Sequence, residues 1–327
     1  MDGIENNKRK SPILIKKMNT LLKRIPLQQF KRKDVEEFLA KQMAGIRGEL
    51  SMDYFYRYLP QEGVKFLHNI RILHQDYYFQ IDTLIITSKF FLILEIKNIA
   101  GHIYFDNLFS QVIRLNDGRK ESFDDPIQQT ERQAYHLSEI LLHNKVPFIP
   151  IEALVVITNP KTLVESAPGH KEAINKVIKS GDLKWKFDDL NRKHAKEVLS
   201  KKDIKKVSRV LTKLHTPYNP DVCSLFKIDK NELIKGVLCL DCEHITLVRT
   251  KRSWYCINCN QYYKDAHIHA LKDYALLIST EITNKEFKDF LNLPTSSQAY
   301  HLLKALYLPY SGSTKSLKYD LKPLLDE

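Results

Sequence analysis

Residues 79–99, FQIDTLIITSKFFLILEIKNI, contain two apolar runs separated by the polar residues 87–89. Runs of this length and composition, with a turn between them, predict a β-hairpin. Because nearly every residue is apolar, we expect both strands to be buried on at least one face. Three charged residues, Asp82, Glu95 and Lys97, nevertheless fall within them. A charge buried without a partner or a metal is costly, so these residues indicate a metal-dependent active site.

The overall composition is typical of a soluble globular protein. The chain has 327 residues, of which 43% are hydrophobic and 28% are charged, enough for two or three domains and one sizeable core. Its formal net charge of +12 favours nucleic acid as a partner, with an acidic membrane surface as the second choice. A basic protein without such a partner is the remaining alternative, because charge bears on association and not on fold.

The sequence predicts a cytoplasmic location. No run approaches the ~18 apolar residues that a membrane-spanning helix needs, and the first residues lack the apolar core of a signal peptide. Four of the five cysteines stand in two tight pairs. In a reducing compartment such pairs indicate metal binding rather than disulfides.

Two helical segments are expected ahead of the hairpin. Residues 1–40 form a basic arm with one short amphipathic helix, and the arm either contacts phosphates or is a solvated leader. A second helix is predicted over residues 34–59, with a break or bend near Gly45 or Gly48, because glycine is unfavourable inside a helix. Glu49 is either an exposed helix glutamate or part of the site, and its place just ahead of a strand-rich core favours the second interpretation.

An α/β fold, with a mixed sheet flanked by helices, is the expected architecture. A helix over residues 126–143 begins at an Asp-Pro pair, in which Asp125 can cap the helix and proline suits the first turn. Gln129 and Gln133 lie one turn apart on it. The order of helix, strand, strand and strand is typical of a sheet with helices packed on its faces. The other predicted strands cover residues 64–73, 101–113 and 151–158.

Two Cys-x-x-Cys pairs, with thirteen residues between them, predict a zinc site. Each pair can offer two thiolates to one ion, and four thiolates complete a tetrahedral shell, so His244 is not needed as a ligand. A segment of this size has too little core to fold without such a metal. The ligands are then Cys239, Cys242, Cys256 and Cys259, while Cys223 lies outside the pattern.

Basic and aromatic residues alternate around the second cysteine pair. Arg249, Lys251, Arg252 and Trp254 suit phosphate contact combined with base stacking. In the alternative interpretation, the aromatic residues pack the small core and the cations are solvated. The sequence does not favour either interpretation over the other.

The last sixty residues predict short helices. Thr283 and Thr295 can each cap a helix, and the two helices are joined by a tight turn. This arrangement resembles a helix-turn-helix, although small helical bundles share it. Residues 311–315 then form either a wing-like loop or a flexible end.

The charged residues of the hairpin suit phosphodiester hydrolysis. Asp82 and Glu95 together can bind a hard cation such as Mg²⁺ or Mn²⁺, with the backbone carbonyl of Ile96 as a further ligand. Lys97, two residues from Glu95, points to the same face of the strand. It can orient or deprotonate a water and stabilise charge on a phosphate. Glu49 could add a carboxylate. Alternatively, Glu95 and Lys97 form an exposed salt bridge without a catalytic role.

The chain resembles the nuclease-related domain (NERD) proteins, a branch of the PD-(D/E)xK nuclease superfamily. The resemblance covers about residues 41–161. It is carried by GIRGE (45–49), QIDTLII (80–86), FLILEIKNIAG (91–101), DPIQQ (125–129) and ALVVITNPK (153–161).

This resemblance implies a restriction-endonuclease-like core. In it Asp82, Glu95 and Lys97 form the catalytic triad, Glu49 is an extra carboxylate and Gln129 is a polar residue near the site. The chain departs from the family at Asp125, where asparagine is common, and in the strand after Gly101, which lacks the usual tryptophan. Neither departure touches the triad. The family also occurs fused to zinc-binding modules. The expected domains are a basic arm (1–40), the nuclease-like domain (41–165), a helical linker or extension (166–232), a zinc-ribbon-like element (233–264) and a helical, helix-turn-helix-like segment (265–327).

We therefore expect a Mg²⁺- or Mn²⁺-dependent nuclease that hydrolyses DNA, with the zinc-ribbon and helical modules used for targeting. A protein that binds DNA or RNA and uses the nuclease-like core only as a scaffold is the alternative. An RNA substrate is a third possibility, since nothing in the sequence recognises a 2′-hydroxyl.

Overall fold

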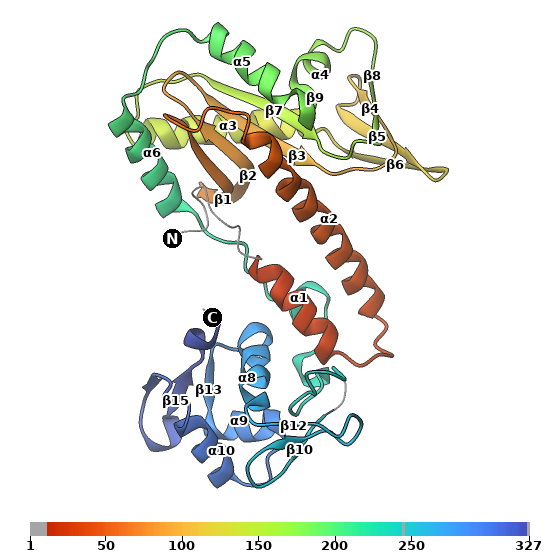
Figure 1. Cartoon of the computed structure of the whole chain (residues 1–327), viewed down its shortest axis with the longest axis vertical. Helices are drawn as coiled ribbons and strands as arrows, with labels where there is room; N and C mark the ends of the chain where they lie inside the picture. The colour runs from red at the N-terminus through yellow and green to blue at the C-terminus, as the bar shows by residue number, and fades with distance from the viewer. Residues whose placement is uncertain (1–11, 244–245, 326–327) are drawn as a thin grey trace. The chain divides into compact units, whose positions relative to one another are not determined.

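The computed structural model describes residues 12–243 and 246–325 (Figure 1). The described residues form two compact units. The core unit contains residues 42–218, and the terminal unit contains residues 12–41 together with residues 219–325. The first eleven residues of the expected basic arm lie outside the described residues, as does His244.

A five-stranded mixed sheet is the centre of the core unit. Its strand order is β1-β2-β3-β7-β9, in which β1, β2 and β3 are antiparallel and β3, β7 and β9 are parallel. The predicted hairpin is confirmed as β2 and β3, and every β3 residue from Phe91 to Ile96 is buried. The bounds are Lys65–His74 (β1), Tyr77–Ile86 (β2), Phe91–Lys97 (β3), Ile151–Ile157 (β7) and Val177–Lys179 (β9).

Helices cover both faces of this sheet (Figure 1). On one face α3 (Pro126–His143) and α6 (Lys201–Leu214) pack against the odd-numbered residues of β3. On the other face α5 (Leu183–Lys193) and the second half of α2 (Arg32–Tyr56) pack against its even-numbered residues. Strand alternation thus places Glu95 and Lys97 on the side of α3. The α3 helix begins as predicted, because Asp125 accepts a hydrogen bond from the Ile127 N–H at 2.8 Å.

A smaller four-stranded sheet, in the order β6-β5-β4-β8, lies beside the main sheet. Its β5–β6 hairpin turns at Asp117 and Gly118, which both have positive φ, as an Asn-Asp-Gly sequence predicts. Ile103, Phe105 and Val112 connect it to the main sheet by packing against Val155 and Ile157. The bounds are His102–Asp106 (β4), Gln111–Asn116 (β5), Arg119–Asp124 (β6), Leu163–Ser166 (β8) and Lys171–Lys176 (α4).

The α2 helix is continuous, so the expected break near Gly45 or Gly48 was wrong. Gly48 serves a different purpose, which is close approach to the sheet. A Cβ atom added there would lie 2.6 Å from the Asn98 Cβ and 3.0 Å from the Thr158 hydroxyl. Asn98 also donates a hydrogen bond to the Ala44 carbonyl at 2.8 Å. Glycine at position 48 therefore lets α2 lie against the ends of β3 and β7. Glu49 is the next residue on this helix.

The terminal unit unites the two ends of the chain. Its α1 helix (Ile13–Arg24) packs with α7 (Val222–Leu225) and α8 (Ala266–Leu277) in one apolar cluster. Arg24 is fully buried at the end of α1. Its guanidinium donates to Asp273 at 2.7 Å and to the Gly236 carbonyl at 2.7 Å. The expected basic arm thus contains a helix that is part of a folded core.

Two small elements complete the terminal unit. The cysteine element is a three-stranded sheet of Val248–Arg249 (β10), Trp254–Tyr255 (β11) and Tyr262–Tyr263 (β12). It shares one apolar cluster with the helical element that follows. That element contains α8, Glu281–Thr283 (β13), Asn284–Leu291 (α9), Ser296–Lys304 (α10), Tyr310–Ser311 (β14) and Lys318–Asp320 (β15).

Candidate active site and metal centre

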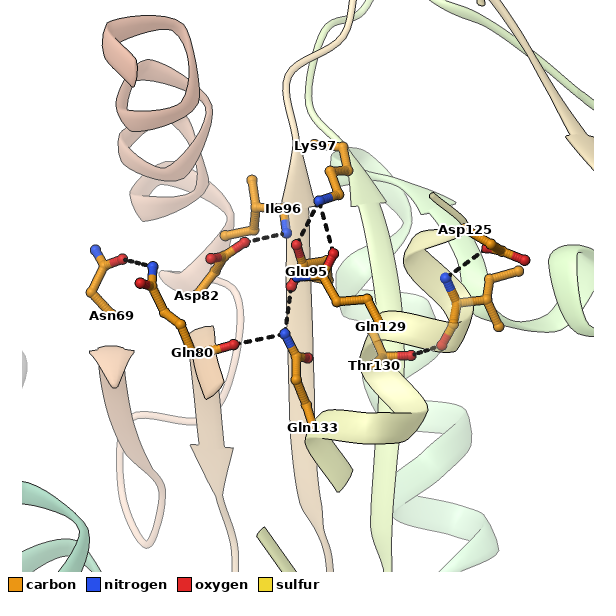
Figure 2. Close-up of polar contacts among 11 residues, drawn as sticks. Asn69, Gln80, Asp82, Glu95, Ile96, Lys97, Asp125, Gln129, Thr130 and Gln133 are labelled. Atoms are coloured by element: carbon orange, nitrogen blue, oxygen red, sulfur yellow. Dashed lines mark hydrogen bonds and ion pairs between the residues drawn. The ribbon is translucent and has the colours of Figure 1, made fainter. Parts of the chain in front are cut away.

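The register of the hairpin brings Asp82 opposite Glu95. Thr83 of β2 pairs with Leu94 of β3 in an antiparallel register. The residue before Thr83, Asp82, therefore faces the residue after Leu94, Glu95. Asp82 is fixed there by the Ile96 N–H, which donates to its Oδ2 at 2.8 Å (Figure 2). Two carboxylates separated by twelve residues in sequence therefore lie side by side on the α3 face of the sheet.

Glu95 is 3% exposed and is held at both carboxylate oxygens (Figure 2). Its Oε1 accepts from the Lys97 ammonium at 2.7 Å, and its Oε2 accepts from the Gln133 amide at 2.8 Å. The Lys97 ammonium also donates to Gln129 Oε1 at 3.2 Å. Lys97 remains partly exposed, so its ammonium lies between a buried carboxylate and solvent.

Glu49 reaches the same region from α2 and is held by Asn69. The Asn69 amide donates to Glu49 Oε2 at 2.7 Å, and its own oxygen accepts from the Gln80 amide at 3.3 Å. The Gln80 carbonyl then accepts from Gln133 at 2.7 Å. A continuous hydrogen-bonded path therefore runs from Glu49 to Glu95, and the part of it from Asn69 onward is drawn in Figure 2.

Asn69 and Gln133 are the residues that sequence reasoning missed at this site. Asn69 has φ of +52° inside β1, and the regular pairing of β1 with β2 is interrupted where it faces Asp82. Strained backbone of this kind concentrates at functional sites. Gln133 could have been found, because it lies one turn after Gln129 on the same helix. Asn69 carries no comparable local signal.

The electrostatics of the site disfavour three bare carboxylates. Burial, and then the negative charges of Glu95 and Glu49, raise the pKa of Asp82 well above its ordinary value. The Ile96 N–H and Lys97 oppose this shift only in part. A bound cation would relieve the repulsion and favour the ionised form of Asp82.

The residues present fit a hard divalent cation. The donor set is carboxylate oxygen, which Mg²⁺ and Mn²⁺ prefer. Gln133 Oε1 is buried and has no hydrogen-bond partner among the described residues, so it could accept from a water on such an ion. The structure shows Ile96 contributing through its N–H, and its carbonyl as a metal ligand stays a prediction.

The four cysteines of the second predicted site lie together. Within the described parts of the chain, they are the one group of three or more potential ligand side chains whose ligand atoms all lie within 4.8 Å of one another. Cys239 Sγ is 3.7 Å from Cys259 Sγ, and Cys256 Sγ is 3.9 Å from Cys242 Sγ. This set has the composition of a structural zinc site. Cys223 is buried elsewhere in the terminal unit.

Two polar side chains contact these thiols. The Tyr263 hydroxyl lies 3.4 Å from Cys239 Sγ and donates to Asp241 at 2.6 Å. The Asn258 amide donates to Cys242 Sγ at 3.2 Å. Such contacts orient metal ligands and tune their charge.

The predicted nucleic-acid residues of the cysteine element fall into two groups. Lys251 and Arg252 are exposed. Trp254 is 1% exposed, and its indole N–H lies 3.4 Å from His267 Nδ1 in the core. Arg249 is partly buried, with its guanidinium 5.0 Å from the Trp254 ring centre. Trp254 therefore has no free face for a base, which agrees with the alternative in which aromatic residues pack the core.

Comparison with known proteins bears on the core unit. The family model of the nuclease-related domain (NERD) matches residues 44–158. These residues include Glu49, Asp82, Glu95 and Lys97. No curated protein and no solved structure matches the chain. Among the described residues, no helix is both long enough and apolar enough to cross a membrane.

Proposed function

From the premise that this chain carries a nuclease-related domain, we propose that the core unit is a metal-dependent phosphodiesterase that hydrolyses DNA. The observation that carries the proposal is the placement of Asp82 beside Glu95, with the Lys97 ammonium 2.7 Å from Glu95. The raised pKa of Asp82 supports it, because burial and then the charges of Glu95 and Glu49 disfavour the ionised carboxylate, and a bound cation would favour it.

Each residue has a defined role in this proposal. Asp82 and Glu95 would hold Mg²⁺ or Mn²⁺, with Glu49 and the Ile96 carbonyl as further ligands. When bound, the cation would supply a more acidic water and neutralise charge on the phosphate. Lys97 places its ammonium toward the developing charge on the phosphate. Gln129 positions Lys97, and Gln133 positions Glu95.

The terminal unit is proposed to target the enzyme to nucleic acid. A structural zinc ion on the four cysteines would hold the cysteine element together, since its three strands are only two residues long. Lys251 and Arg252 are exposed and suited to phosphate contact. Arg249 belongs to the same proposed surface, whereas Trp254 supports it from the core. A cytoplasmic location is also retained as a proposal.

Cleavage of plasmid and linear DNA tests the catalytic proposal. We expect Mg²⁺- or Mn²⁺-dependent cleavage by the full chain, and a loss of about a hundredfold or more in Asp82→Asn and in Lys97→Ala. Lys193→Ala is the matched control, because it removes a lysine that pairs with Glu152 at 2.7 Å elsewhere in the core unit. Cleavage that is equal in all four proteins would disprove the assignment.

The same assay, together with a DNA-binding measurement, tests the alternative in which the core is a scaffold. The structure offers one observation in its favour, since the Lys97 ammonium is already engaged by Glu95 and Gln129. In that case DNA binding is salt-sensitive and needs no divalent cation, and no cleavage occurs. Single-stranded RNA of the same sequence, added as a parallel substrate, separates the DNA and RNA versions of the nuclease.

A further inference from the structure

The final element of the chain has the connectivity of a helix-turn-helix with a wing. After α8 the order is strand, helix, helix, strand and strand, and the three strands form a sheet in the order β13-β15-β14. The chain turns from α9 to α10 within four residues, at Asn292 with φ of +53°. We call residues 266–320 the winged element.

The second helix of this pair, α10, buries little of its own surface. Ala299 and Leu303 are its buried residues, and the partly buried Leu302 also packs against the core. The other side chains of the helix are polar or aromatic. The exposed side chains are Ser296, Ser297, Gln298, Tyr300, His301 and Lys304. A helix that carries a polar face of this kind is free to enter the groove of a partner.

Charge is distributed unevenly over the winged element. Residues 290–319, which contain α10, β14 and the first two residues of β15, include three lysines and no aspartate or glutamate. One of these lysines, Lys318, pairs with Glu281 at 3.3 Å. The carboxylates of the element lie outside this stretch, on α8 and α9, in β13 and at the last residue of β15. A stretch with lysines and without carboxylates suits a polyanion such as DNA.

Exposed tyrosines lie within the same stretch. Tyr300 is 42% exposed, Tyr307 is 93% exposed and Tyr310 is 69% exposed. The Lys304 ammonium lies 5.6 Å from the Tyr300 ring centre. Tyrosine hydroxyls and lysines are common donors to DNA phosphates, while glutamine can recognise adenine by two hydrogen bonds.

We propose that α10 is a recognition helix for double-stranded DNA, with the β14–β15 wing contacting the adjacent backbone. An α-helix fits the major groove, whereas single-stranded binders use open grooves with stacking platforms. Gln298 and His301, three residues apart on the exposed side of α10, face the bases in this assignment, and Lys304, three residues further on, faces a phosphate. The inference deepens the proposed targeting role and rests on it, but it does not depend on hydrolysis.

Binding of a labelled 20-base-pair duplex to the full chain, measured by fluorescence anisotropy without added divalent cations, tests the assignment. We expect Lys304→Ala to weaken binding about tenfold at moderate salt and to reduce the salt dependence by about one phosphate contact. Lys322→Ala is the matched control, because Lys322 is an exposed lysine of the same unit outside residues 290–319. It should bind as the wild type does. Zinc content and thermal unfolding verify that both variants are folded.

A second variant addresses base recognition. Gln298→Ala should reduce the preference of the chain among duplexes of different sequence while changing average affinity less than Lys304→Ala does. Because binding is measured without the divalent cation on which the proposed cleavage depends, its outcome is separate from that of the catalytic proposal. Equal losses in Lys304→Ala and Lys322→Ala, tighter binding to single strands than to duplex, or no duplex binding by the wild type would each overturn the assignment.

Discussion

Two groups of side chains in this molecule are suited to bind metal ions, and they are built in opposite ways. In the terminal unit four thiols lie within 4.8 Å of one another, and they come from two Cys-x-x-Cys pairs that are close in sequence. In the core unit Glu49, Asp82 and Glu95 come from three different elements, and protein donors occupy each of them. The first arrangement is a closed set, which leaves no position for a substrate. The second arrangement, which we call the open site, keeps carboxylates in place for an ion that must also meet a phosphate.

The largest expected effect comes from removing one thiol of the closed set. Cys256 is fully buried in the apolar cluster that the cysteine element shares with α8, α9 and α10. Cys256→Ser should lose zinc, whose binding contributes about 10 kcal/mol in small zinc domains, and the elements in that cluster should lose their order. The core unit should keep its fold, because its clusters are separate. Zinc content and limited proteolysis of the full chain measure the two outcomes.

Cys223→Ser is the matched control for this prediction. Cys223 is also buried in the terminal unit but lies in the cluster with α1, away from the four thiols. This variant should retain one zinc ion per chain. Retention of full zinc by Cys256→Ser as well would show that the four cysteines do not act as a set.

The stability of the core unit should depend on how closely α2 approaches the open site. A methyl group at Gly48 would meet the Asn98 Cβ at 2.6 Å, so Gly48→Ala must displace the helix that carries Glu49. We expect a loss of about 1 to 3 kcal/mol in the free energy of unfolding, together with reduced cleavage. At Gly45 an added Cβ meets nothing within 4 Å. Gly45→Ala should therefore be neutral or stabilise the helix by up to about 1 kcal/mol. Urea unfolding of both variants tests the contrast, and similar losses would contradict it.

These glycines also show how far sequence reasoning reaches. The hairpin, α3 with its Asp125 cap, and the four cysteines were predicted because each depends on residues close in sequence. The break in α2 was predicted wrongly, since glycine propensity is local but its contact with Asn98 is not.

Long-range packing accounts for the other differences. Asn69 joins the site only because β1 is interrupted opposite Asp82, and no spacing rule reports that. The burial of Trp254 depends on its packing against α8, so an aromatic residue next to basic ones looked equally suited to a surface. Residues that hold a site are thus harder to predict than residues that perform its chemistry.

The charge of Asp82 gives a pH-dependent prediction for the open site. Its pKa in the folded protein is raised, first by burial and then by Glu95 and Glu49. Ionisation of Asp82 therefore costs stability, and that cost appears as the pH rises from the ordinary aspartate range, about pH 4, through the raised value. Asp82→Asn keeps an oxygen for the Ile96 N–H but cannot ionise. Without Mg²⁺ or Mn²⁺ it should be more stable than the wild type at pH 7, by about 0.5 to 3 kcal/mol, and the difference should shrink near pH 4.

Addition of the cation should reverse this order. Mg²⁺ or Mn²⁺ should raise the unfolding temperature of the wild type, more strongly at higher pH, and should leave Asp82→Asn nearly unchanged. Thermal unfolding with and without the cation, at pH 5 and pH 8, measures both effects. A wild type that responds to the cation no more than Asp82→Asn does would remove Asp82 from the ligand set.

The smallest expected effect concerns the closed set and tests how completely it is determined by its thiols. The Tyr263 hydroxyl is 3.4 Å from Cys239 Sγ and donates to Asp241, so it can orient that thiolate without binding the ion. Tyr263→Phe should weaken zinc binding about tenfold in competition with a chelator and leave the fold intact at saturating zinc. Tyr262→Phe is the matched control, because Tyr262 is the exposed neighbour in the same strand. Equal zinc affinity in the two variants would mean that four thiols alone determine this site, and that only the carboxylate site depends on its surrounding hydrogen bonds.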